Sequence, residues 1–410
     1  MYRLFVKNCR DSVDMPIFVD IDHVILPIPN LYIFSTYKNL SHYVQVTVKT
    51  RYGTLRDSLD YRPISSTTAN QYVGRLFNYL DYLNYFDLKH GTNFFYAHVN
   101  IPEEILNDYI NDELILNQGK GDFAVKQAKD AIQSYYNFLA KIGLTTLKDI
   151  FIRPKLLPIA IKNTKPRLAV KYLGQSQKNT LYRCCKKHSH KIALRLGAEA
   201  GLRSKELRGL RLADFVYFRK KHKGILSLIE DMERDEDKTV FIFFLQGTYS
   251  KGSSNKGGRS RNIYISRELL NSIREYIGGE RKQLKNQYSK DSLLLQKDGY
   301  EIPNCFGTNT FNSIKNKALK RPDLFGEGQA LVHKDHSFHT LRHSFGTDKF
   351  HEFCDQNKVD PDSITPDSAV MIEVARLLGH SLRGKAALET TGRYIRSLHE
   401  KLNMEGGFET

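Results

Sequence analysis

The residues of this chain whose types and spacing suit catalysis lie in its last half. The motif GLRSKEL brings Arg203, HTLRH brings His339 and Arg342, LLGH ends at His380, and the last tyrosine of the chain is Tyr394. Attack on a phosphodiester needs cations that hold the negative charge of the transition state, groups that accept and donate protons, and an oxygen nucleophile. Two guanidiniums, two imidazoles and one phenol supply that set without a metal.

In this order the motifs resemble the catalytic signature of the tyrosine recombinase (phage integrase) family. The resemblance is close over about the last 240 residues and looser, by organisation, over the preceding ~110; four short motifs in one order are far more specific than any one alone. It implies that Tyr394 is the nucleophile and that Arg203 and Arg342 clamp the scissile phosphate. It further implies that His339 and His380 form hydrogen bonds to that phosphate or handle protons.

Two residues beside these motifs are expected to support them. Glu206 stands one helical turn after Arg203 and is expected to orient it, although a surface ion pair at this spacing is the ordinary alternative. His343 fills the last place of HTLRH and is expected to be a buried helix residue. The intervals from Arg342 to His380 and from His380 to Tyr394 are longer than the family pattern and indicate insertions.

A basic hairpin is expected between the first arginine motif and the histidine motif. The β-rich runs TVFIFFLQ and RNIYIS flank the turn TYSKGSSNKGGRS. The resemblance implies that one lysine here donates a proton to the departing 5′ oxygen, and Lys251 is the first choice, with Lys256 as the substitute. The other cations are expected to contact DNA phosphates: Lys256, Arg259 and Arg261.

A histidine cluster offers a rival reading of the same region. His333, His336, His339 and His343 form H-x2-H-x2-H-x3-H, which superficially resembles a metal site. No paired cysteines lie nearby, and a rhythm that runs from a loop into a helix need not converge on one point. We therefore expect no metal and no cofactor; a zinc-dependent nuclease would be distinguished by its sensitivity to EDTA.

Composition favours a nucleic-acid partner. Lys and Arg number 62 against 45 Asp and Glu, which gives a net charge of +17 and a pI near 9.4, and such a chain binds polyanions. The sequence shows no run of about 18 apolar residues and no basic leader before an apolar segment. The expected partner is double-stranded DNA and not a membrane, and the expected location is the cytoplasm, with the nucleoid. The five cysteines are scattered and are expected to be reduced thiols.

Periodicity predicts a mainly α fold with small β elements, in four parts. Residues 1–61 form a β-rich module (FVDIDHVILPIP, LYIFSTY, YVQVTVKTRYG), either a DNA-gripping arm or a packing extension. Residues 62–150 carry three amphipathic helices, from Ser65, over 102–116 and over 121–142, which resemble the helical core-binding domain that clamps DNA in this family. Residues 151–172 form a basic linker, with Lys165 and Arg167 expected on DNA.

Residues 173–410 form the mixed α+β catalytic domain. Helices are expected over 177–200, 204–210, 267–276, 308–319, 339–350, 368–378 and 393–402. The function implied by the resemblance is site-specific DNA recombination or integration through a 3′-phosphotyrosyl link, without metal or ATP. Assembly of a tetramer on two DNA sites is implied in the same way. Two alternatives stay open: a type IB topoisomerase-like nicking and closing enzyme, and an architectural DNA-binding protein that kept the fold without turnover.

Overall fold

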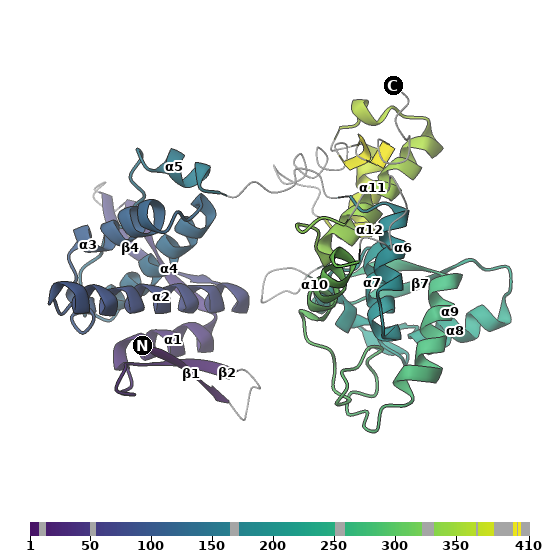
Figure 1. Cartoon of the computed structure of the whole chain (residues 1–410), viewed down its shortest axis with the longest axis horizontal. Coiled ribbons are helices and arrows are strands. Elements are labelled where there is room, and N and C mark those ends of the chain that lie inside the picture. Colours follow the sequence, from purple (N-terminus) through teal and green to yellow (C-terminus); the bar gives the residue numbers. More distant parts are fainter. Residues whose placement is uncertain are drawn as a thin grey trace. The chain divides into compact units, whose positions relative to one another are not determined.

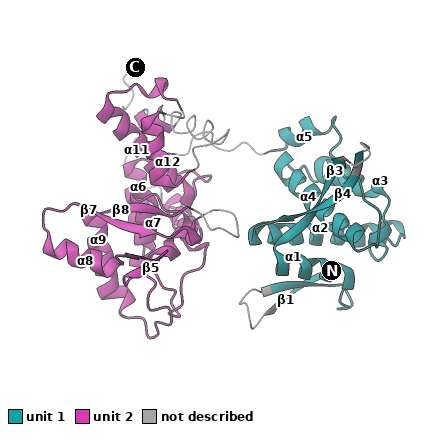
Figure 2. Ribbon diagram, turned by 180° about the vertical axis from the view of Figure 1, so that it is seen from behind, with its two compact units in different colours: residues 1–166 teal, residues 167–410 magenta. Residues whose placement is uncertain are grey.

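The computed structural model describes residues 1–7, 14–49, 55–164, 172–250, 259–321, 332–365, 368–380, 397–399 and 401–402. The chain divides into two compact units, Met1–Pro166 and Arg167–Thr410 (Figure 2). The described residues are mainly helical and carry four small sheets, each of two antiparallel strands (Figure 1). The predicted fold class is therefore confirmed.

Unit 1 combines two hairpins with a set of helices. Strands β1 (Tyr2–Lys7) and β2 (Asp14–Val19) form one hairpin, and β3 (Ser41–Lys49) and β4 (Leu55–Pro63) form the other. The helices are α1 (Pro27–Asn39), α2 (Ser66–His90), α3 (Glu103–Asp108), α4 (Asp122–Lys141) and α5 (Leu157–Lys162). A π-helical segment, Tyr109–Asn117, continues α3, and a short 3₁₀ turn covers His98–Asn100.

Helices α2 and α4 form the centre of unit 1. The Ser65 hydroxyl caps α2 by accepting from the backbone N of Thr68 at 3.0 Å. Buried faces of the two helices meet, and the Tyr79 and Tyr136 hydroxyls lie 3.2 Å apart between them. The β-containing segment joins the same core, since Phe18, Tyr32 and Ile33 are buried in one cluster with residues of α2 and α4. The described part of residues 1–61 therefore shares one hydrophobic core with the helices of unit 1.

One sequence expectation for unit 1 is wrong. The run LYIFSTY, read as extended, lies within the helix α1. Two prolines in the first turn suit a helix start, and Tyr32, Ile33 and Thr36 fall on one buried helical face. A short apolar run with β-branched residues has no decisive period, and the core that it meets decides its conformation.

Unit 2 begins with helices α6 (Gln175–Arg183) and α7 (His188–Glu199), followed by the 3₁₀ turn Ser204–Gly209. Next come the hairpin of β5 (Phe215–Tyr217) and β6 (Lys220–His222), helix α8 (Ile225–Arg234), strand β7 (Val240–Leu245), the 3₁₀ turn Gly247–Tyr249, and strand β8 (Arg261–Ser266), which pairs with β7. The remaining elements are helix α9 (Arg267–Tyr276) with the π-helical turn Ile277–Arg281, α10 (Phe306–Leu319), α11 (Phe338–Asn357), the 3₁₀ turn Pro361–Ser363 and α12 (Ala369–Leu378).

Helix α7 is the central helix of unit 2 and packs against α9, α10 and α11. A second apolar cluster lies between α11 and α12 and includes Leu398 from the described piece near the C-terminus. The helix expected over 177–200 is two helices, α6 and α7, broken at residues 184–187. The helix that carries HTLRH extends to Asn357, so the polar stretch after Phe350 begins as helix. No described helix is both long and apolar enough to span a membrane.

Candidate active site

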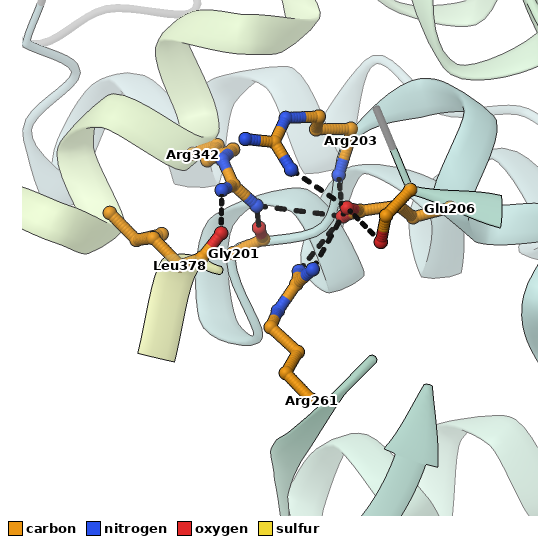
Figure 3. A network of polar contacts seen from close by, with 7 residues as sticks. Gly201, Arg203, Glu206, Arg261, Arg342 and Leu378 are labelled. Atoms are coloured by element: carbon orange, nitrogen blue, oxygen red, sulfur yellow. Dashed lines mark hydrogen bonds and ion pairs between the residues drawn. The ribbon is translucent and has the colours of Figure 1, made fainter. Parts of the chain in front are cut away.

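The carboxylate of Glu206 is the centre of a polar cluster in unit 2 (Figure 3). Glu206 lies in the 3₁₀ turn that begins directly after Arg203, and its side chain is fully buried. Its Oε2 accepts from the backbone N of Arg203 at 2.8 Å, and its Oε1 accepts from Arg203 Nη1 at 2.9 Å. Glu206 therefore caps the turn that follows Arg203 and also orients the Arg203 side chain. The Arg203 side chain keeps 22% of its surface exposed.

Arg261 approaches the same carboxylate from strand β8. Its Nη1 and Nη2 each donate to one oxygen of Glu206, both at 2.8 Å. The Ser250 hydroxyl, which follows strand β7, adds a bond of 3.1 Å to Oε1. Both ends of the described part of the β7–β8 hairpin are therefore tied to the turn that carries Arg203.

Arg342 completes the cluster from helix α11, and it is almost fully buried. It donates through Nη1 to the carbonyl of Gly201 and through Nη2 to the carbonyl of Leu378, and Nη1 lies 3.5 Å from Glu206 Oε2 (Figure 3). These carbonyls lie just after α7 and at the last residue of α12. One guanidinium thus joins three chain segments that are distant in sequence.

Three guanidiniums around one carboxylate fix its charge state. Burial by itself raises the pKa of Glu206, but the hydrogen bonds and charge of Arg261, with the charges of Arg342 and Arg203, outweigh it and hold the pKa well below the ordinary value. Glu206 is therefore ionised, and the cluster keeps an excess of positive charge. That excess is suited to an anionic ligand such as a phosphodiester.

The backbone at Gly201 permits this close arrangement. Gly201 has φ +63°, a conformation that favours glycine, and an added Cβ would lie 2.6 Å from Cδ1 of Phe345. Its carbonyl can therefore meet Arg342 while α11 packs against the end of α7. The positive φ and the close contact with Phe345 explain why a glycine precedes Leu202 and Arg203 in this motif.

His380 follows the glycine that ends α12. Gly379 has φ +63°, and the backbone N of His380 donates to Ala375 O at 2.8 Å, so the helix closes in a left-handed cap. Burial, and then the positive charges of Arg342 and Arg203 with those of His343 and His339, lower the pKa of His380 to about 3. His380 is therefore a neutral imidazole at ordinary pH, and it lies close enough to Arg342 and Arg203 for their charges to lower its pKa.

His339 and His343 lie on one face of α11, with ring centroids 4.6 Å apart. His339 is exposed, and His343 is half-buried where we expected a buried residue. His336 is buried instead, and its Nδ1 accepts from the backbone N of His333 at 3.1 Å. Within the described parts of the chain, no group of three His, Cys, Asp or Glu side chains is arranged to hold a metal ion.

The structure brings Arg342 and His380 to the turn that carries Arg203 and Glu206, although both are distant from that turn in the sequence. A cavity of about 320 Å³ opens beside them between β8 and α12, and its lining includes Arg259, Arg261 and His380. Arg259 is exposed, and its Nη1 donates to the carbonyl of His380 at 3.2 Å. Five candidates lie outside the described residues: Lys165, Arg167, Lys251, Lys256 and Tyr394.

One candidate has a different place from the one expected. Arg261, expected on DNA, is buried and both of its terminal nitrogens bind Glu206. The sequence held a signal for this, because strand alternation puts Arg261 on the same face as the buried Ile263 and Ile265. Sequence analysis also missed Ser250 and the two carbonyls that Arg342 binds, since backbone acceptors and a lone serine leave no motif.

Comparison with known proteins gives one family match and a set of similar solved structures. Residues 171–360 match the model of the phage integrase family, and no curated protein sequence matches the chain. A XerA recombinase structure is 16% identical, with 84% of this chain and 94% of that chain covered, at a TM-score of 0.35. The pre-cleavage complex of XerH recombinase with its difH substrate is 15% identical, with 80% and 76% covered, at 0.49. A lambda integrase(75–356) dimer on a core site is 14% identical, with 80% and 90% covered, at 0.41.

Proposed function

Because residues 171–360 place this chain in the phage integrase family, we propose that it is a tyrosine-type site-specific recombinase that cleaves and rejoins double-stranded DNA through a 3′-phosphotyrosyl intermediate. The observation that carries the proposal is the convergence of Arg203, Arg342 and His380 on one cationic cluster, organised by the buried Glu206. An excess of fixed positive charge, set in place before the substrate binds, is what a phosphoryl transition state requires.

In the proposed cleavage step, the Tyr394 oxygen attacks the scissile phosphorus and the bond from phosphorus to the 5′ oxygen breaks. Lys251 donates its proton to that leaving oxygen, which departs as a 5′-hydroxyl. The phenol proton passes to an imidazole nitrogen, for which His339, exposed on α11, is the candidate. Attack of a 5′-hydroxyl on the phosphotyrosine reverses every step, so the exchange balances without water, ATP or a metal.

The remaining groups take supporting roles in this proposal. Arg203 binds the phosphate through the part of its guanidinium that Glu206 leaves exposed, and Arg342 stabilises the cluster and contributes its charge. His380, neutral because its pKa is about 3, is suited to hydrogen-bond a phosphate oxygen. Arg259, Lys256, Lys165 and Arg167 are proposed to bind DNA phosphates, as a basic chain with this chemistry requires.

Recombination joins two sites, so we also propose that four copies of the chain assemble on two DNA duplexes, in the cytoplasm and with the nucleoid. The four-part division of the chain (1–61, 62–150, 151–172 and 173–410) is kept as a proposal for how it binds, with the helical segment of unit 1 holding DNA.

The test is a denaturation-resistant protein–DNA adduct. Wild type and Tyr394→Phe are incubated in EDTA with a nicked suicide substrate that carries the cognate site, identified from the DNA that flanks the gene. An adduct from wild type alone supports the proposal, and an adduct from both variants moves the nucleophile elsewhere. Specific binding without any adduct would favour an architectural protein, and loss of cleavage in EDTA would favour a metal-dependent nuclease. Relaxation of supercoiled DNA that lacks the site would favour a topoisomerase-like enzyme.

A further inference from the structure

The β5–β6 hairpin presents an exposed aromatic ring at its tip. Strands Phe215–Tyr217 and Lys220–His222 are joined by a turn of two residues, Phe218 and Arg219 (β5 is labelled in Figure 2). Phe218 is 84% exposed, the largest exposed fraction among the large hydrophobic side chains that the structure describes. A phenyl ring so exposed contributes little to the core of unit 2.

The backbone of this turn is strained for the residues it carries. Phe218 has φ +46° and Arg219 has φ +63°. A two-residue hairpin turn with both φ values positive favours Asn-Gly, because a Cβ is disfavoured in this region. A bulky ring kept at such a position without burial is an outlier of the kind that marks functional sites.

Exposed cations follow Phe218 in the sequence. Arg219, Lys220, Lys221 and Lys223 follow it directly, and all four are exposed. Lys221 pairs with Asp214 at 3.5 Å and Lys223 with Asp231 at 2.6 Å. Among the described residues, no acidic side chain within ion-pair distance accompanies Arg219 or Lys220, so these two charges are available to an anion.

The hairpin is held firmly on strand β7. The rings of His222 and Phe244 are stacked, with their centroids 3.9 Å apart. The ring centroid of Tyr217 lies 5.8 Å from that of Phe244, and the ring centroid of Phe215 lies 6.0 Å from that of Phe243. Strand β7 leads into the turn that ends at Ser250, the serine that donates to Glu206. Strand β7 and the turn after it therefore connect the β5–β6 hairpin to the arginine cluster around Glu206.

We propose that the tip, residues 217–221, is a second DNA contact of unit 2. Arg219 and Lys220 bind backbone phosphates, and the Phe218 ring lies against a base or a deoxyribose in the groove, as exposed apolar side chains of DNA-bending proteins do. The inference rests on the proposed function. DNA is favoured over an anionic lipid surface because the same unit carries a cluster suited to a phosphodiester, and because one exposed ring offers little area for membrane insertion.

The test uses the full chain and a fluorescent duplex of arbitrary sequence, with the dissociation constant measured over a series of salt concentrations. Arg219→Gln/Lys220→Gln is expected to reduce the slope of log affinity against log salt by about 1.8, since each lost phosphate contact contributes about 0.9. The matched control is Lys282→Gln/Lys285→Gln, which removes the same charge from another exposed segment of unit 2 and is expected to leave the slope unchanged.

The ring is tested by Phe218→Gly, which suits the left-handed backbone and removes the side chain. We expect thermal stability no lower than that of wild type, because glycine relieves the strain of the positive φ. We also expect an unchanged salt slope and affinity weakened by about tenfold, the order of one lost aromatic contact with a base. Phe218→Tyr is expected to bind as wild type does.

The outcomes separate the two proposals. If wild type binds no duplex, the proposed function and this inference both fail. If wild type binds and the hairpin variants behave as the lysine control does, the inference alone is overturned. It is equally overturned if the hairpin variants keep their DNA affinity and salt slope but lose binding to phosphatidylserine vesicles.

Discussion

Arg261 and Glu206 form a two-point ion pair inside unit 2, with Nη1–Oε1 and Nη2–Oε2 both at 2.8 Å and both side chains nearly inaccessible to solvent. The pair joins the first residue of β8 to the turn that presents Arg203. Because the proposed general acid Lys251 follows β7 and precedes β8 in the sequence, we expect the same pair to fix the position of Arg261, at the start of β8, relative to Arg203. Arg261 is thus a positioning residue for the site.

We expect Glu206→Gln to destabilise the protein strongly. The amide keeps the shape of the carboxylate but leaves three guanidiniums without their anion, and breaking a buried charge pair costs about 3 to 5 kcal/mol. The free energy of unfolding in urea measures this. The control is Glu301→Gln, whose carboxylate is partly exposed beside Arg208, and whose loss we expect to cost about 1 kcal/mol or less. Equal losses in the two variants would contradict a special role for Glu206.

The contribution of Glu206 to the free energy of unfolding should decrease at acidic pH. Its pKa is lower in the folded state than in the unfolded chain, so its stabilisation is complete above the ordinary value of 4.5 and is lost as the pH falls from there toward the depressed folded value. The difference in unfolding free energy between wild type and Glu206→Gln should therefore shrink on acidification below 4.5. A difference that stays constant through that range would rule out this linkage.

His380 should remain uncharged while ordinary histidines titrate. Its folded pKa of about 3 lies below the ordinary 6.5, so the unfolded chain binds a proton in this interval that the folded chain does not, and stability contributed by neutral His380 is lost as the pH falls from 6.5 toward 3. In His380→Asn we expect a flatter dependence of unfolding free energy on pH over that interval. The imidazole carbon resonance of His380 should show no titration near neutral pH, and a midpoint near 6.5 would refute the assignment.

Arg342→Ala should lower the stability of the protein, in addition to removing a positive charge from the site. The substitution removes the donors to the carbonyls of Gly201 and Leu378, and each buried acceptor left unpaired costs about 1 to 3 kcal/mol. Arg342→Lys should recover only part of the loss, because a single ammonium cannot reproduce the planar fork. Arg376→Ala, which removes a 71% exposed guanidinium from α12, should stay within about 0.5 kcal/mol of wild type.

Gly201→Ala should lower both stability and adduct formation. A methyl group there meets the Phe345 ring at 2.6 Å on a backbone with φ +63°, and strain of this kind costs about 1 to 3 kcal/mol. Arg203 lies two residues after Gly201, so a shift of this backbone should also displace Arg203. We therefore expect the cleavage rate to fall by more than the loss of folded protein accounts for. Gly143→Ala is the control, because Gly143 also has positive φ but an added Cβ meets nothing within 4 Å. Equal effects of the two substitutions on cleavage would contradict the steric argument.

Much of the helical framework was predictable, because amphipathic periods and caps are local. The Ser65 cap, helix α4 and helix α9 lie where the sequence indicates. The hairpin β5–β6 and helix α8 were not anticipated, since strands of three residues carry too few alternations to recognise. The break between α6 and α7 was likewise missed, and it depends on Glu280, whose carboxylate binds the backbone N of His188 and of Ser189 from a distant part of the chain.

The sequence by itself determined which chemical groups the protein has, their order, and its excess of positive charge, because motifs and composition are properties of the chain alone. Only the tertiary structure decided how those groups are used. Arg261 is a cation on a hairpin in the sequence, and it became the partner of Glu206 because folding buried both and a buried charge requires its counter-ion. Arg342 likewise turned to the carbonyls of Gly201 and Leu378, because two helix ends meet there and their acceptors needed a donor.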